Sequence, residues 1–69
     1  MSQKEIVEAL RAARIAAGLT QAQVGQQLGI RAEHAARMVC RWESGAVPAL
    51  PRLIEWAEAL GVTLAVVPR

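Results

Sequence analysis

The sequence has one cysteine, Cys40, and one histidine, His34, among its 69 residues. A single cysteine forms no disulfide within the chain, and one cysteine with one histidine is too few for a metal site. A chain this short buries only about 60% of the surface that it exposes when unfolded, so its core is marginal. We therefore expect a reducing compartment, and stabilisation by self-association.

Long apolar runs are also absent, although 54% of the residues are hydrophobic. A helix that spans a membrane needs roughly 18 consecutive apolar residues. The first ten residues, MSQKEIVEAL, mix charged with apolar side chains and lack the apolar stretch of a secretory signal. These features predict a soluble, cytoplasmic protein.

The signatures of catalysis are missing as well. The chain has no aspartate, no nucleophile beside a base, no cluster of metal ligands and no glycine-rich phosphate-binding loop. The sequence therefore predicts a protein that is not an enzyme and that uses no cofactor and no metal.

Positive charge, by contrast, is concentrated in one segment. The formal net charge is +2, and residues 31–41 hold three arginines and His34 against one glutamate, Glu33. Four other glutamates lie towards the two ends of the chain: Glu5, Glu8, Glu55 and Glu58. This distribution favours a polyanionic partner, although a solvated helix face would have the same charges.

Apolar residues recur at helical intervals in four segments, which predicts helices over residues 3–17, 21–28, 32–43 and 50–60. Ser2 with Glu5, and Thr20 with Gln23, have the spacing of capping boxes at the first two helix starts. Ser44-Gly45 and Pro48 mark a loop of about six residues before the last helix.

Two of these helices carry apolar faces that we expect to be buried. The face of the third helix consists of Ala32, Ala35, Ala36, Val39 and Trp42. The face of the fourth helix consists of Leu50, Leu53, Ile54, Ala57 and Leu60.

The segment 62–67 reads Val-Thr-Leu-Ala-Val-Val and lies between Gly61 and Pro68, which predicts a β-strand. Because the chain offers no second strand, we expect it to pair with the same segment of a second copy about a two-fold axis. The alternative is a loose or helix-packed tail. The expected division is residues 1–61 as a helical domain and residues 62–69 as a dimerisation segment, with contacts by Val62, Thr63, Leu64, Ala65, Val66 and Val67.

Several short strings of residues follow one another in a characteristic order. They are Leu10-Arg11-x-Ala13-Arg14, Gly18-Leu19-Thr20-Gln21, Val24-Gly25-x-x-Leu28-Gly29-Ile30, Arg41-Trp42-Glu43-Ser44-Gly45 and Ala59-Leu60-Gly61-Val62. Together they resemble the Cro/CI-type (XRE-like) helix-turn-helix family of bacterial and phage repressors. The resemblance implies a mainly α fold, a lambda-repressor-like bundle of four helices whose third helix enters the major groove of DNA.

The spacing departs from the family pattern in one place. Between Gly29 and Trp42 the chain carries about four additional residues, which correspond to about one helical turn. Either Arg31 to Ala35 add a first turn to the third helix, or they lengthen the preceding turn so that the helix begins near Ala35. No Ser, Thr, Asp or Asn marks a helix start at either place, so both readings stay open.

The resemblance also implies roles for residues at matching positions. Gln21, beside the N-cap Thr20, is expected to contact a DNA phosphate at the start of the second helix. Arg14 and Glu43 are expected to form an internal ion pair. Gly25 is expected to let the second and third helices approach closely. We expect Trp42 in the core, and Trp56 either in the core or at a dimer interface.

Arg37 and Arg41 lie four residues apart on the third helix and are the best candidates for reading bases, because guanidinium groups pair bidentately with guanine O6 and N7. Met38 is expected to touch a thymine methyl group or to pack partly in the core. The segment with Arg31, Glu33 and His34 is expected to contact bases or phosphates. A Glu33–Arg37 pair at i,i+4 would fix the rotamer of that arginine.

These features predict an autoregulatory repressor in the nucleoid that binds a palindromic double-stranded DNA operator as a homodimer. Its two recognition helices would lie about one DNA turn, roughly 34 Å, apart. The alternative is an antitoxin that neutralises a partner toxin protein and co-represses its own operon, since a helix-turn-helix domain with a short C-terminal strand resembles some antitoxins.

Overall fold

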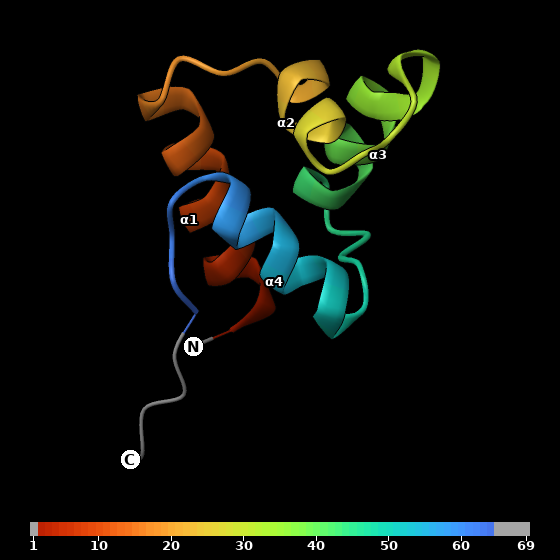
Figure 1. The fold of residues 1–69 in the computed structure, drawn as a ribbon. Coiled ribbons are helices and arrows are strands. Elements are labelled where there is room, and N and C mark those ends of the chain that lie inside the picture. The colour runs from red at the N-terminus through yellow and green to blue at the C-terminus, as the bar shows by residue number, and fades with distance from the viewer. Residues whose placement is uncertain (1, 65–69) are drawn as a thin grey trace.

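The computed structural model describes residues 2–64, which form four helices (Figure 1). They are α1 (Gln3–Ala16), α2 (Gln21–Gln27), α3 (Ala32–Glu43) and α4 (Leu50–Ala59). The four predicted helices are confirmed, and each end lies within one residue of its expected place, apart from the start of α3, which the sequence left open between Ala32 and Ala35. None of the helices in this part of the chain is long and apolar enough to cross a membrane.

Local side-chain contacts define the first two helix starts. The Ser2 hydroxyl accepts from the backbone N–H of Glu5, and the Thr20 hydroxyl accepts from that of Gln23. In both cases the longer side chain bonds back to the N-cap backbone, so both predicted capping boxes are present. In contrast, α3 and α4 begin without a side-chain cap.

All four helices contribute to one apolar core. Its fully or almost fully buried members are Leu10, Val24, Val39, Trp42, Trp56 and Ala57. The rings of Trp42 and Trp56 lie 5.3 Å apart between centroids and are tilted by 45°, an arrangement that aromatic pairs favour over a face-to-face stack. Trp42 therefore lies in the core as predicted, and Trp56 is a core residue as well.

The predicted apolar faces of α3 and α4 are only partly correct. On α4, Leu50 and Ile54 are 64% and 41% exposed. The face that packs inward instead consists of Leu53, Trp56, Ala57 and Leu60, which lie at i, i+3, i+4 and i+7. The large indole of Trp56 places this side of the helix on the core. On α3, Ala35, Val39 and Trp42 are buried, whereas Ala32 and Ala36 are exposed.

The predicted C-terminal strand is not found in residues 62–64, which have no strand structure. The backbone N–H of Val62 donates to the carbonyl of Ala57 at 2.9 Å and closes the end of α4. Val62 and Leu64 are half-buried against the core of their own chain, and Thr63 is exposed. Within residues 62–64 the apolar side chains thus pack on the helices of their own chain. The rest of the predicted segment, Ala65, Val66 and Val67, lies outside the described residues.

Candidate nucleic-acid interface

Helices α2 and α3 form a compact helix–turn–helix unit (Figure 1). Between them Gly29 has a φ of +80°, which glycine adopts without strain. The backbone N–H of Ile30 then bonds to the carbonyl of Gly25 at 3.0 Å. A Cβ atom built on Gly25 would lie 2.7 Å from the Cβ of Ala35. Gly25 therefore stands at the close approach of the two helices that was predicted for it.

The additional residues lengthen α3 and not the turn. The helix begins at Ala32, and the backbone N–H groups of His34 and Ala35 both donate to the carbonyl of Arg31 at 2.9 Å. Ala35 is completely buried against α2, so the turn that precedes it extends α3 beyond its contact with α2. Of the two readings that the sequence left open, the structure has the longer helix.

The outward side of α3 carries most of the predicted DNA-contacting residues. A shallow depression there is lined by His34, Arg37, Met38 and Arg41, which share one helix face at i, i+3, i+4 and i+7. All four are exposed, Met38 by 36%, so Met38 is not a core residue. Cys40, also exposed, lies outside this depression.

Arg37 and Arg41 differ from the other arginines within residues 2–64. Four arginines have a nitrogen no more than 3.8 Å from a glutamate oxygen: Arg11, Arg14, Arg31 and Arg52. Arg37 and Arg41 have no such partner in this part of the chain. The Glu33–Arg37 pair that the i,i+4 spacing allows does not form. Glu33 pairs with Arg31 instead, at 2.9 Å between Oε1 and Nε.

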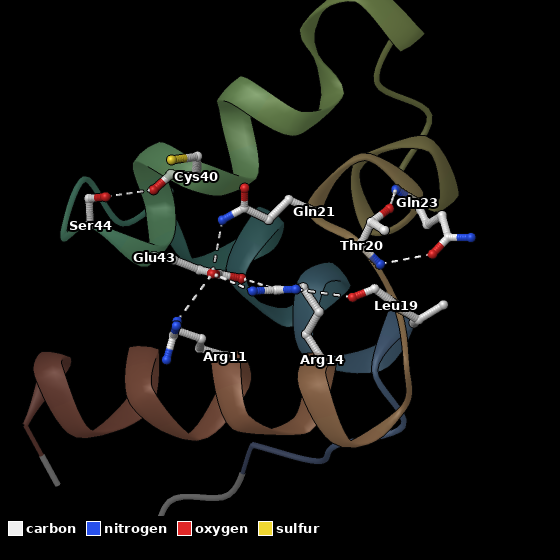
Figure 2. Close-up of polar contacts among 9 residues, drawn as sticks. All are labelled: Arg11, Arg14, Leu19, Thr20, Gln21, Gln23, Cys40, Glu43 and Ser44. Carbon is white, nitrogen blue, oxygen red and sulfur yellow. Dashed lines mark hydrogen bonds and ion pairs between the residues drawn. The ribbon is translucent and has the colours of Figure 1, made fainter.

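Behind this face, the carboxylate of Glu43 joins the first three helices (Figure 2). Arg14 donates from Nε to Oε2 at 2.7 Å and from Nη2 to Oε1 at 3.1 Å. The Nη1 of Arg14 donates to the carbonyl of Leu19 at 3.0 Å. Arg11 lies 3.8 Å from the same carboxylate. The ion pair implied by the family resemblance is therefore present, with Arg11 as an additional neighbour that the sequence did not indicate.

Burial strengthens the central pair. The side chain of Glu43 is 4% exposed and that of Arg14 is 13% exposed, so water screens their attraction poorly. The hydrogen bonds from Arg14 to Glu43 raise the pKa of the guanidinium above its usual value, and the charge of the carboxylate acts in the same direction, against the opposing effect of burial. Arg14 thus stays charged at any pH at which the protein would be studied.

The comparison with known protein families agrees with this geometry. The model of the helix-turn-helix family matches residues 10–67. The chain belongs to the helix-turn-helix family. It is a member of the Cro/CI-type (XRE-like) branch, whose proteins bind double-stranded DNA and regulate transcription. No curated protein and no solved structure matches the chain.

In this helix-turn-helix protein the two residues at the start of α2 have internal partners. The Thr20 hydroxyl caps the helix by accepting from the backbone N–H of Gln23 at 3.0 Å (Figure 2). The amide of Gln21 is turned towards Glu43, to which its Nε2 donates at 3.1 Å. A primary amide has two N–H donors, and this bond uses one of them. The sequence did not indicate this contact, because nothing in the spacing of Gln21 and Glu43 brings them together.

Proposed function

We propose that this helix-turn-helix protein is a sequence-specific repressor that binds a palindromic operator in double-stranded DNA as a homodimer, in the bacterial cytoplasm and nucleoid. The observation that carries the proposal is the exposed pair of Arg37 and Arg41 on the outward side of α3. Both guanidinium groups are free of glutamate partners in the described chain. They are therefore available for bidentate contacts with guanine.

The rest of the interface serves to orient α3 on the duplex. Gln21 has one amide N–H left for a phosphate oxygen, and Thr20 holds the start of the helix that presents it. Phosphate contacts of this kind fix the register of a protein on DNA without reading its sequence. His34, Met38, Arg31 and Glu33 extend the surface around the two arginines, and each has the exposure that contact with bases or phosphates requires.

The direct test is a selection of preferred duplexes from a randomised pool, followed by footprinting of the DNA upstream of the protein's own gene. We expect the selected sites to be palindromic and a related palindrome to be protected in the upstream DNA. If the upstream DNA shows no protection, autoregulation is wrong. If no duplex binds even at low salt, DNA binding by this chain is wrong.

Dimerisation is the second half of the proposal. One helix-turn-helix unit makes few contacts, and specific affinity in this class comes from two half-sites read together. Val62 and Leu64, in the tail of residues 62–64, pack their side chains against the core of their own chain, whereas the side chain of Thr63 is exposed. This leaves the tail backbone at Thr63 as a place for a second copy to pair through main-chain hydrogen bonds.

The variant Thr63→Pro removes one backbone N–H at this place and keeps the apolar contacts of its neighbours. We expect it to be monomeric in sedimentation experiments and to lose affinity for a two-half-site duplex, whereas Thr63→Ala should behave as the wild type. If Thr63→Pro dimerises as strongly as the wild type, pairing through the tail is wrong.

A further inference from the structure

Three charged residues of α3 form a row along its outward side. Glu33, Arg37 and Arg41 are spaced at i, i+4 and i+8 in a helix that runs from Ala32 to Glu43, and all three are exposed. The helical rise separates successive members by about 6 Å and the ends of the row by about 12 Å. The major groove admits an α-helix, so a row on the outward side of α3 can face base edges when the helix lies in the groove. The row presents one acceptor followed by two donors.

Glu33 stands at the end of α3 that is expected to enter the groove most deeply. In helix-turn-helix complexes the N-terminal residues of the recognition helix contact the base edges. The additional turn makes Glu33 one of these residues, since α3 begins at Ala32. We propose that Glu33 is a specificity-determining residue that selects cytosine at one position of each half-site. This inference rests on the proposed function, because it assumes that α3 reads DNA.

The base follows from hydrogen-bonding chemistry. An ionised carboxylate only accepts hydrogen bonds. In the major groove guanine presents two acceptors, and thymine presents an acceptor and a methyl group. Adenine presents a donor beside an acceptor, and cytosine presents the N4 donor alone. A carboxylate is therefore repelled by guanine and thymine, and it meets cytosine without the opposing N7 acceptor of adenine.

A carboxylate near DNA must also tolerate the surrounding phosphates, and Arg31 makes this possible. Its Nε lies 2.9 Å from Oε1 of Glu33, so the two side chains together carry no net charge. The Arg31–Glu33 pair uses Oε1, which leaves Oε2 to accept from a base. Both side chains are well exposed, at 81% and 54%, so the acceptor is accessible.

Glu33 also has a simpler role available, since an acidic residue in the first turn of a helix interacts favourably with the helix dipole. That role predicts a small change in stability and no change in base preference when Glu33 is replaced. The two roles are therefore separated by measuring which sequences bind, and not how well the protein folds.

The experiment selects duplexes from a randomised pool with the full chain, in parallel for the wild type, Glu33→Gln, Glu33→Ala and the control Glu58→Gln on α4. Circular dichroism checks that each variant is folded. We expect one position per half-site at which the wild type and the control prefer cytosine by about tenfold. Glu33→Ala should lose that preference, and Glu33→Gln should shift it to adenine, which glutamine pairs with bidentately.

Two results would overturn the assignment while leaving the proposed function intact. One is that Glu33→Gln and Glu33→Ala select the same sites as the wild type. The other is that both variants bind every duplex more tightly by the same factor, which would make Glu33 a repulsive charge near phosphates. If the wild type selects no duplex at all, the proposed function fails first and the role of Glu33 fails with it.

Discussion

At the scale of single residues, the distance between α2 and α3 depends on the missing side chain of Gly25. A Cβ atom built on Gly25 would lie 2.7 Å from the Cβ of Ala35, and also 2.8 Å from both the Cα and the carbonyl oxygen of that residue. The latter two atoms belong to the backbone of α3 and cannot move aside without shifting the recognition helix. The orientation of the DNA-binding face therefore depends on a glycine that makes no contact with DNA itself.

We predict that Gly25→Ala destabilises the fold by about 1–3 kcal/mol through overpacking. Alanine at an unconstrained helix position would instead stabilise the protein by about 1 kcal/mol. Urea unfolding followed by tryptophan fluorescence measures the difference, with Gln26→Ala at the next, exposed position as control. Adding Ala35→Gly should not restore stability, because it removes the Cβ contact and leaves the two backbone contacts. A Gly25→Ala protein as stable as the wild type would contradict the close approach.

The buried carboxylate of Glu43 leads to a second prediction. Glu43→Gln keeps the shape of the side chain and removes the charge that faces Arg14, whose side chain is 13% exposed. Removing one partner of a buried pair leaves the other charge uncompensated, so we expect a loss of about 3 kcal/mol in the free energy of unfolding.

The matched control is Glu55→Gln, since Glu55 lies 3.7 Å from Arg52 with both side chains at least 40% exposed. This surface pair should contribute less than about 1 kcal/mol. Equal losses for the two variants in chemical denaturation would show that Glu43 is not the link between helices that its contacts indicate.

The contacts of Glu43 also show where inference from sequence ends at this scale. Its pairing with Arg14 was expected only through the family resemblance, because the two residues lie 29 positions apart. Glu33 pairs with a different arginine from the one that its helical spacing suggested. The i,i+4 rule that favoured Arg37 applies within a helix, whereas Arg31 is the N-cap of α3, with a ψ of 144°. From that extended backbone its side chain reaches Glu33 across the helix start.

At the scale of helices, most ends could be predicted, whereas the start of α3, which has no side-chain cap, and the buried faces could be predicted only in part. Capping boxes and glycine stops are local signals, readable without knowing the neighbouring helices. Which side of α4 faces inward depends instead on where Trp56 fits among the other three helices. The first residues of the predicted C-terminal strand show the same limit. Their apolar and β-branched composition favoured a strand, but Val62 and Leu64 pack on the core of their own chain, which composition alone does not distinguish from strand pairing.

Arg52 connects two helices in a way that leads to a third prediction. From α4 its Nη1 donates to the carbonyl of Leu28, the C-cap of α2, at 3.0 Å. A cation at a helix C-terminus is favourable for the dipole and satisfies a carbonyl without a partner in the helix. We expect Arg52→Ala to lower the free energy of unfolding by about 1 kcal/mol. Lys4→Ala, at an exposed position in the first turn of α1, should change it by less than half as much. Equal effects would mean that Arg52 does not hold the end of α2.

At the scale of the whole molecule, the net charge of +2 understates the positive charge that is free to meet DNA. Most arginines in residues 2–64 are close to glutamates, and their charges largely cancel. The exceptions, Arg37 and Arg41, lie together on α3. The arginine charge that no glutamate offsets is thus concentrated on the recognition helix, which favours an oriented approach to a polyanion.

The final prediction separates base reading from phosphate contact for Arg41. The logarithm of the affinity should fall linearly with the logarithm of the salt concentration, by about 0.9 for each phosphate neutralised. If Arg41 reads a base, Arg41→Ala should keep this slope and relax the preference at one position per half-site, at a cost of about 1–3 kcal/mol on the preferred duplex. If it contacts a phosphate, the slope should fall by about 1 and all duplexes should weaken alike.

We expect the first result, because Arg41 shares the outward face of α3 with His34 and Arg37, and residues on that face point into the groove when α3 docks. Fluorescence anisotropy over a salt series, on a selected duplex and a scrambled one, distinguishes the two, and a uniform loss with a reduced slope would place Arg41 on the DNA backbone.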